Sequence, residues 1–502
     1  MASATDLPQN EVAIPEFKQV MGHPRPLWML FMTEFWERFA FYGIRWALVL
    51  YIVAQFFGGD ASGEKSANQT YGAYLALVYA GAIFGGYVAD KVLGYQRSIL
   101  LGAVIMAAGL FMIAMPSPEI FKLGLATIIA GNGLFKPNIS TMVGKLYSAA
   151  DERRDSGFTI FYMGINLGAM IAPILTGYLA SKVFGTDEFP AYKVVFIAAG
   201  IGMLISLVWF WFGRAQLAGI GRPIEADGGG KAKVLYVLIG TLLAIPLIYF
   251  LLSISATTLQ WYVLFPMFAL LCIMIMIEGI KDGAVQRDRA IAMLIIFTFN
   301  ILFWMFFEQA GSSFTFLAEK IVDKNVMGFA WPVAWFQSVN SLAIIVFAPI
   351  MAWLWVRLGN SNPSIPRKFG LGLIFNGLAF LLLMFALTKL LNDAGMIPFW
   401  TLFMVYVIQS IGELCLSPIG LSMVTKLAPL RLVGFGMGGW FLSTGIGNNL
   451  SGIFAGEVSG ETGMTAASAL SGYTFGFWVL LIAGGLLFLI APLIQKLMHG
   501  VK

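Results

Sequence analysis

Two glutamates and two arginines lie inside the first long apolar run of this 502-residue chain, which extends from residue 27 to about residue 57. Glu34, Glu37, Arg38 and Arg45 fall at spacings that place them on one face of a helix. A charge at the centre of a membrane helix costs roughly 2.5–3.5 kcal/mol on insertion scales. Such a stripe is tolerated where it faces water or opposite charges, which predicts a transport path or a proton relay. The alternative is a structural seam of ion pairs between helices.

Three further charged residues occur in the middle of apolar runs: Lys136, Glu308 and Glu413. The first half of the chain therefore supplies cations, namely Arg38, Arg45 and Lys136, together with its two glutamates, whereas the second half supplies carboxylates only. Opposed charges of this kind suit a zwitterionic ligand. They also suit ion pairs between two halves of a molecule that form and break as the halves move. Permanent structural salt bridges remain the alternative.

Other polar or amphipathic side chains in the apolar runs could contact amide groups or rings of a ligand. Each of them alone is a weak signal, because a buried tyrosine is more often part of a hydrogen-bonded core. They are Tyr42, Tyr79, Asn166, Asn340 and Trp440.

The elements that position these residues must be membrane helices. Hydrophobic residues make up 59% of the chain and charged residues only 11%, against about 25% charged in soluble proteins, and the mean hydropathy is +0.82. The long unbroken apolar runs exclude a barrel, whose strands alternate. The two histidines, His23 and His499, lie near the chain ends, and the two cysteines form no motif. We therefore expect no enzyme, no cofactor other than protons as the coupling ion, and no nucleic-acid partner.

The hydropathy pattern predicts an all-α polytopic fold with fourteen transmembrane helices. We divide the chain into a polar tail (1–26), a six-helix bundle (27–212), a linker with two extra helices (213–289) and a second six-helix bundle (290–502). The predicted spans are 27–57, 71–90, 98–115, 119–146, 156–184, 191–212, 234–253, 259–280, 290–316, 330–357, 369–391, 397–427, 431–457 and 470–498.

The two bundles repeat each other. The segment from Pro137 to Leu146 aligns with the segment from Pro418 to Leu427, and the same shift places Gly131 on Gly412. Two six-helix halves of the same orientation are the plan of major facilitator transporters, whose site lies between the halves near the midplane. Basic residues concentrate in the loops on the side of the two termini, which predicts that both termini are cytoplasmic.

Several motifs resemble those of the proton-dependent oligopeptide transporter (POT or PTR) family, and the likeness covers nearly the whole chain. The family's ExxERFxYYG signature is similar to the segment from Glu34 to Gly43, and its FYxxINxG signature to the segment from Phe161 to Gly168. The run from Gly133 to Asn138 and the Gly412-Glu413 pair before Ser417-Pro418 also look like this family. One departure is visible: Phe41 replaces the first tyrosine of the usual pair. The chain also lacks the second-helix histidine of animal members.

The resemblance implies roles for the residues named above. Glu34, Glu37, Arg38, Lys136 and Glu308 would couple protons to transport, with Lys136 as the ionic partner of the first-helix group. Arg45 and Lys136 would bind a peptide carboxylate, and Arg45 would pair with Glu308 across the bundles. Glu413 would bind the amino terminus, and the site would be lined by Tyr42, Tyr79, Asn166, Asn340 and Trp440.

These features predict a proton-coupled symporter that imports di- and tripeptides by alternating access. We expect a functional monomer in the lipid bilayer of the cell membrane, with peptides and protons as its ligands. A transporter of nitrate or another organic anion on the same fold is the alternative. A channel is disfavoured because the chain has an internal repeat with a charged interface.

Overall fold

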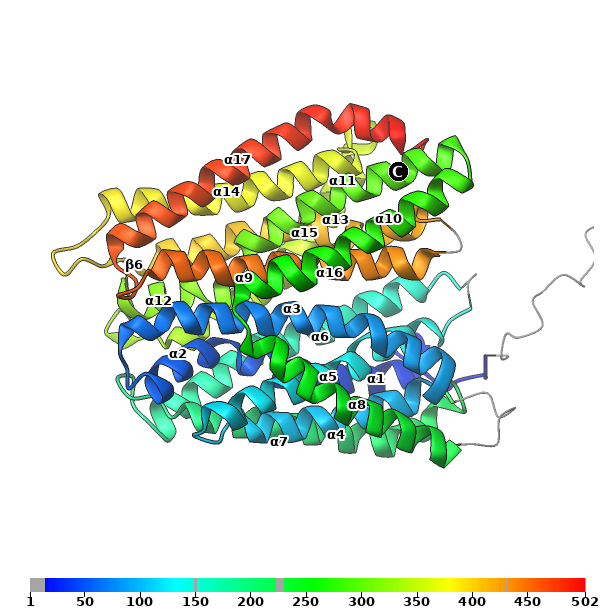
Figure 1. The fold of residues 1–502 in the computed structure, drawn as a ribbon, viewed down its shortest axis with the longest axis horizontal. Coiled ribbons are helices and arrows are strands. Elements are labelled where there is room, and N and C mark those ends of the chain that lie inside the picture. Colours follow the sequence, from blue (N-terminus) through cyan, green and yellow to red (C-terminus); the bar gives the residue numbers. More distant parts are fainter. Residues whose placement is uncertain (1–13, 149–150, 223–229, 430–431, 502) are drawn as a thin grey trace, which may run out of the picture.

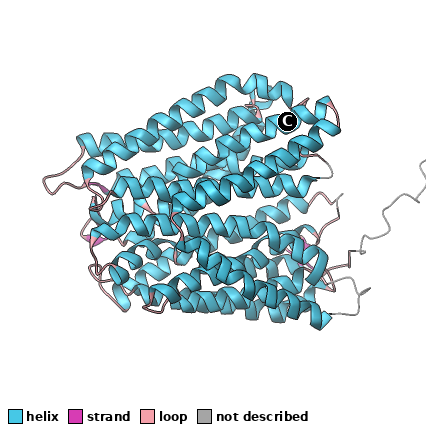
Figure 2. Cartoon of the chain, in the orientation of Figure 1, coloured by secondary structure: helices cyan, strands magenta, loops and turns pink. Residues whose placement is uncertain are grey.

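The computed structural model describes residues 14–148, 151–222, 230–429 and 432–501, and most of these residues are helical (Figure 2). Helices of the first half lie side by side in the lower part of Figure 1, and helices of the second half lie above them. The strands of the described chain form three pairs at the ends of helices, and each strand is two residues long. Both ends of the described chain lie at the same end of the molecule (Figure 1).

The described residues of the first half form seven α-helices. They and the short segments between them are β1 Gln19–Val20, β2 His23–Pro24, α1 Arg25–Gly43, α2 Arg45–Phe56, the 3₁₀-helix η1 Ala61–Gly63, α3 Glu64–Val88, the π-helix η2 Ala89–Leu93, α4 Tyr95–Met112, α5 Pro118–Gly144, α6 Arg154–Tyr178, the π-helix η3 Leu179–Val183, α7 Tyr192–Gly213 and the 3₁₀-helix η4 Arg214–Leu217.

The extra helices and the second half follow. They are α8 Gly230–Ser253, α9 Ala256–Leu259, the π-helix η6 Gln260–Leu264, α10 Phe265–Lys281, α11 Ala284–Phe307, the 3₁₀-helix η7 Glu308–Gly311, α12 Ser313–Lys320, β3 Val322–Asp323, β4 Asn325–Val326, β5 Phe329–Ala330, η8 Val333–Trp335, α13 Phe336–Leu358, η9 Gly359–Ser361, α14 Ile365–Lys389, β6 Ile397–Pro398, α15 Phe399–Leu427, α16 Val433–Ser459 and α17 Ala466–Leu497.

Twelve helical segments of the described chain are long and apolar enough to cross a membrane. The helices α5 and α16 are also long, with 27 residues each, and they pack among the others. Both contain many glycine, asparagine, serine and threonine residues, and they are not among the twelve. The all-helical membrane fold is confirmed, whereas the count of fourteen spans stays a prediction.

The predicted repeat is visible in how the helices pack. A Cβ added to Gly131 of α5 would lie 2.7 Å from the carbonyl oxygen of Gly102 on α4. A Cβ added to Gly412 of α15 would lie 2.9 Å from the carbonyl oxygen of Gly372 on α14. Because only glycine permits such close approach of two helices, the aligned glycines hold equivalent helix pairs together in the two halves.

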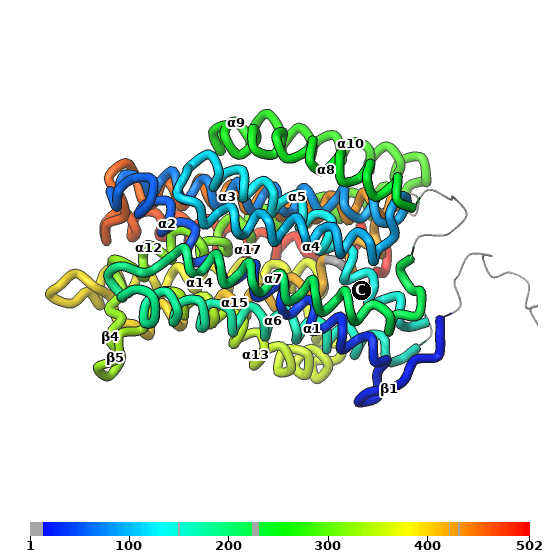
Figure 3. The backbone as a smooth tube through the Cα atoms, turned by 90° about the horizontal axis from the view of Figure 1, so that it is seen from below, coloured from blue at the N-terminus to red at the C-terminus, as the bar shows by residue number. Residues whose placement is uncertain are grey.

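The two extra helices form a hairpin on one side of the molecule, outside both bundles (Figure 3). α8 packs on α5 of the first half, and α10 packs on α11 and α16 of the second half. Only Ile245 and Leu252 of α8 are buried, as expected for a helix that faces lipid over most of its surface.

The first predicted span is interrupted inside its motif. α1 ends at Gly43, α2 begins at Arg45, and Ile44 between them has φ −85° and ψ −17°. The hydroxyl of Thr176 on α6 lies 3.1 Å from the carbonyl oxygen of Gly43, so the break is satisfied from a neighbouring helix. The first helix of the second half is interrupted in the same way, where α11 gives way to η7 at Glu308.

Candidate functional site

A buried cluster of three charged side chains lies on one face of α1. Arg38 Nη2 donates to Glu37 Oε1 at 2.6 Å, Arg38 Nε also pairs with Glu37 Oε2, and Arg38 Nε lies 3.2 Å from Glu34 Oε1. None of the three is more than 3% exposed. Asn132 Nδ2 on α5 donates to Glu37 Oε1 at 3.2 Å. Two carboxylates therefore share one guanidinium, and Glu34, Glu37 and Arg38 of the predicted stripe form a single ionic unit.

The two glutamates of this cluster differ in how fully they are bound. Both oxygens of Glu37 accept hydrogen bonds. Glu34 Oε2 is buried and has no hydrogen-bond partner among the described residues. An unsatisfied buried carboxylate oxygen is costly, and a proton bound to it would remove that charge without displacing Arg38.

Lys136 does not pair with this cluster as we expected. Its Nζ lies 4.5 Å from the ring centroid of Tyr79 on α3, and no carboxylate of the described residues lies within 4.0 Å of it. Arg38 occupies the ion-pairing positions because it is on the same helix as both glutamates, one and four residues away. Lys136 remains within electrostatic range of the α1 cluster and of Glu308, which leaves its ammonium available to another anion.

The predicted pair between the bundles is present. Arg45 Nη2 lies 2.5 Å from Glu308 Oε2, and Arg45 Nε donates to Tyr71 Oη at 2.8 Å. Each partner stands at the point where the first helix of its half is interrupted. The two breaks therefore bring opposite charges together across the boundary between the halves.

Glu413 lies on the second half, in a polar surrounding of its own. Asn340 Nδ2 on α13 donates to Glu413 Oε2 at 3.1 Å and to Ser410 Oγ at 2.8 Å. Glu413 is half-buried and makes no ion pair with the described residues. It lies within electrostatic range of Arg45 and Glu308, so the expected cations and carboxylates do gather in one central region.

The remaining predicted residues occupy different positions around this region. Tyr42 is flanked by the guanidiniums of Arg38 and Arg45, each 5.9 Å from its ring centroid. Asn166 donates to Tyr162 O at 3.0 Å, within α6. Trp440 is 5% exposed and packs on Gly420 and on the rings of Phe297 and Phe369, as part of the second bundle. Contact of any of these residues with a ligand stays a prediction.

Phe41, the departure from the usual tyrosine, also contributes to the α1 cluster. The Arg38 guanidinium lies 4.9 Å from its ring centroid, and the ring stacks on Tyr74 at 6.5 Å. Tyr74 Oη is buried without a hydrogen-bond partner among the described residues. Phe41 therefore covers the guanidinium with an apolar face.

The sequence reading missed a face of α3 that contacts the second half. Glu64, Asn68 and Gly72 follow one another at intervals of four and therefore form a stripe on one side of α3. The predicted span began only at residue 71, so the beginning of this stripe was overlooked. Glu64 pairs with Lys320 and accepts from Met464 N at 2.8 Å. Asn68 Nδ2 donates to Ala455 O and Ser459 Oγ, both at 3.1 Å. A Cβ on Gly72 would lie 2.7 Å from Gly452 Cα.

These contacts close the molecule at the end remote from both chain termini. Lys65 adds ion pairs to Glu457 at 3.1 Å and Glu461 at 2.7 Å, and Trp335 Nε1 donates to Ile174 O at 3.2 Å. These contacts between the two halves seal this end of the molecule and separate it from the central charged residues.

Among the described residues, no group of three His, Cys, Asp or Glu side chains could hold a metal ion. The central region instead offers guanidiniums, one free ammonium, carboxylates and amides. Such groups can bind a molecule that carries both charges and can exchange protons through the carboxylates.

Comparison with known proteins places the chain in a family. A family model of the POT family (PTR2) matches residues 96–469. Peptide transporter YePEPT of Yersinia enterocolitica is 35% identical over 488 residues, which cover 90% of this chain and 91% of that protein. Dipeptide and tripeptide permease A of Citrobacter koseri is 33% identical over 466 residues, which cover 91% of this chain and 88% of that protein. A crystal structure of a mutant of peptide transporter POT in complex with alafosfalin has a TM-score of 0.81 at 35% identity, with 96% of this chain and 97% of that chain covered. The chain is therefore a multi-pass membrane protein of the POT family.

Proposed function

We propose that this protein is a proton-coupled symporter that imports di- and tripeptides by alternating access. One observation carries the proposal. Arg45 and Lys136 of the first half and Glu308 and Glu413 of the second half gather in one central region between the two bundles. A short peptide is a zwitterion, so its two ends match the two signs of charge. The relatives named as peptide transporters and as a dipeptide and tripeptide permease support this class of substrate.

In this proposal the peptide carboxylate binds Lys136, whose ammonium has no carboxylate partner among the described residues, and Arg45. The amino terminus binds Glu413, where Asn340 holds one carboxylate oxygen at 3.1 Å. Tyr42, Tyr79, Asn166 and Trp440 complete the surroundings. The charged ends are common to all peptides, whereas side chains differ, so recognition of the ends permits many sequences.

Proton coupling rests on the carboxylates, and no cofactor takes part. A proton on Glu308 would remove the charge that holds Arg45 at 2.5 Å and would free this guanidinium for the peptide. A proton on Glu34 Oε2 would occupy the oxygen that has no partner. The membrane potential contributes ~2.3 kcal/mol per charge per 100 mV, which the pH gradient supplements.

We place the protein in the cell membrane with both termini in the cytoplasm, as a functional monomer. With that orientation the sealed end faces outward, and the structure corresponds to a state closed to the outside. Import then requires the Glu64–Lys320, Lys65–Glu461 and Arg45–Glu308 pairs to separate in the outward-facing state. The two extra helices carry no charge in their middle and act as a scaffold.

Transport of nitrate or another small anion on the same fold is less well supported. A small anion needs the cations only and leaves Glu413, with its amide partner Asn340, without a role.

The test is uptake of labelled dialanine into liposomes that contain the purified protein, under an imposed inward proton gradient. We expect accumulation above the external concentration, its loss with a proton ionophore, and competition by unlabelled tripeptide but not by nitrate. Glu413→Gln should weaken uptake of dialanine about tenfold, since a hydrogen bond to a charged group contributes about 1.5 kcal/mol or more. Absence of uptake for every di- and tripeptide, together with gradient-driven nitrate uptake, would overturn the proposal.

A further inference from the structure

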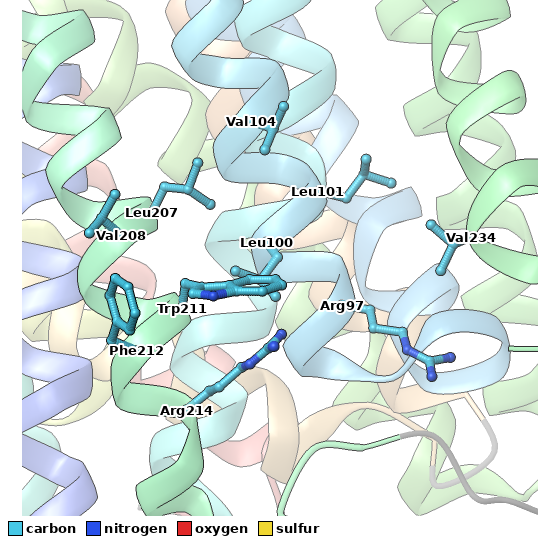
Figure 4. A pocket seen from close by; sticks show the side chains of 10 residues that line it. All are labelled: Arg97, Leu100, Leu101, Val104, Leu207, Val208, Trp211, Phe212, Arg214 and Val234. Atoms are coloured by element: carbon cyan, nitrogen blue, oxygen red, sulfur yellow. The ribbon is translucent and has the colours of Figure 1, made fainter. Parts of the chain in front are cut away.

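An apolar pocket of about 500 Å³ lies outside the central site, between α4, α7 and the beginning of α8 (Figure 4). It is at the end of the molecule that carries both chain termini, where α4 begins, α7 ends and α8 begins. All three helices are among those long and apolar enough to cross a membrane. The pocket therefore opens at the edge of the bilayer, on the side of the termini.

Two arginines lie at the end of this pocket that is nearer to the chain termini. Arg97 is the third residue of α4, and Arg214 directly follows the last residue of α7. The Arg214 guanidinium lies 3.6 Å from the ring centroid of Trp211 (Figure 4). Arg97 Nη1 lies 3.5 Å from Gly230 O, the first residue of α8. Neither guanidinium lies within 4.0 Å of a carboxylate in the part of the chain that the structure describes. Two cations thus share one pocket, and no carboxylate of the described residues pairs with either of them.

The rest of the pocket is apolar and extends toward the bilayer interior. Leu101 and Val104 continue from Arg97 along α4, and Val208 precedes Arg214 on α7. Val104 lies seven residues beyond Arg97, which corresponds to about 10 Å along a helix. Val104 and Val208 are each 51% exposed, so the apolar wall is open to the surrounding lipid. Charge at one end and an apolar groove at the other match the two parts of a phospholipid.

We propose that this pocket binds an anionic phospholipid from the leaflet on the side of the termini. Its phosphate lies between Arg97 and Arg214, and one acyl chain lies along Leu101, Val104 and Val208. Basic pockets between transmembrane helices commonly accept anionic head groups, and guanidiniums bind phosphate oxygens through two parallel hydrogen bonds. Val234 of α8 lines the same pocket, so the bound lipid also contacts the beginning of α8.

The test is native mass spectrometry of the full-length protein in detergent, titrated with phosphatidylglycerol or with phosphatidylcholine of the same acyl chains. We expect a phosphatidylglycerol adduct at concentrations where phosphatidylcholine gives none. Arg97→Gln and Arg214→Gln should each weaken this binding about fivefold, and the double variant about 30-fold, from the contribution of one basic residue near an anionic surface. Val104→Trp, which fills the apolar wall and leaves both arginines in place, should weaken it as well.

The matched control is Arg357→Gln. Arg357 is at the same end of the molecule, and its guanidinium lies 5.0 Å over the ring of Trp353, but it is outside the pocket and should leave the adduct unchanged. Equal binding of the two lipids, or an unchanged phosphatidylglycerol affinity in the double variant, would overturn the proposal. So would an arginine-dependent dimer in place of the adduct, because a second copy of the chain would then be the occupant. If the double variant fails to fold, the two single variants and Val104→Trp decide by the same criterion. All readouts are independent of transport.

Discussion

Two guanidinium–carboxylate groups near the middle of the molecule share their chemistry and differ in which element supplies the partners. Arg38 and its two glutamates all belong to α1, so their mutual distances are set within one helix. Arg45 and Glu308 belong to different halves and meet at interrupted helices. Movement of one half against the other leaves the first group intact and separates the second. The first group can therefore gain and lose protons without a change of conformation, whereas the second reports the conformation directly.

Arg38→Leu should have the largest effect on this comparison. It leaves Glu34 and Glu37 buried without a cation, and removal of one partner of a buried ion pair costs about 3–5 kcal/mol. We expect a strongly lowered melting temperature or no folded protein, measured by thermal unfolding in detergent. Adding Glu34→Gln and Glu37→Gln to the same variant should restore folding but not uphill transport. A wild-type melting temperature in Arg38→Leu would show that the cluster is not a single ionic unit.

Glu34→Gln and Glu37→Gln should each abolish accumulation driven by the proton gradient while counterflow exchange of peptide persists. The physical reason is that an amide is nearly isosteric with a carboxylate but cannot take up a proton. Glu37→Gln should also lower the melting temperature more than Glu34→Gln, because Glu37 contacts Arg38 with both oxygens. Undiminished uphill uptake by either variant would remove that residue from the coupling mechanism.

A charge exchange tests the pair between the halves. Arg45→Glu and Glu308→Arg each place like charges together, and we expect about tenfold to hundredfold lower uptake, since disrupting a buried charged pair costs 2 kcal/mol or more. The combined variant restores opposite charges and should bind the two halves together again. A crosslink across the sealed end, between cysteines placed at Lys65 and Glu461, provides the measurement. Crosslinking should fall in each single variant and recover in the double variant. Equal crosslinking in all four proteins would argue against a gating role.

The smallest effect is expected at an exposed ion pair near the chain termini. Arg153 holds the pKa of Asp151 at about 2, below its usual value of 3.8, through side-chain and backbone hydrogen bonds. Any stability from this depressed pKa is fully present above pH 3.8 and is lost only as the pH falls through about 2. Asp151→Asn should therefore leave the dependence of uptake on pH unchanged between about pH 5 and pH 8. A shifted pH profile in this variant would place a coupling group outside the central region.

Much of the central site follows from local patterns. Helical spacing predicted that Glu34, Glu37 and Arg38 share a face, and the pairing of Arg45 with Glu308 follows from the family resemblance. The structure bears out both. The pairing of Lys136 with the first-helix glutamates was wrong, because Arg38 reaches both carboxylates from within its own helix and Lys136 stacks on Tyr79. The face of α3 from Glu64 to Gly72 was missed, since it begins outside the hydropathy-defined span.

The sequence by itself determined the membrane class, the repeat of two bundles, the helix faces that carry charge and the family. Hydropathy and periodicity depend only on the order of residues along each helix, so they can be recognised without knowing which helices pack together. Only the tertiary structure decided that Lys136 lies over Tyr79 without a carboxylate partner among the described residues, where the first helices are interrupted and which end is sealed. These features depend on distances between helices. Contacts between helices, such as those of Gly72 with Gly452 and of Thr176 with Gly43, set these distances.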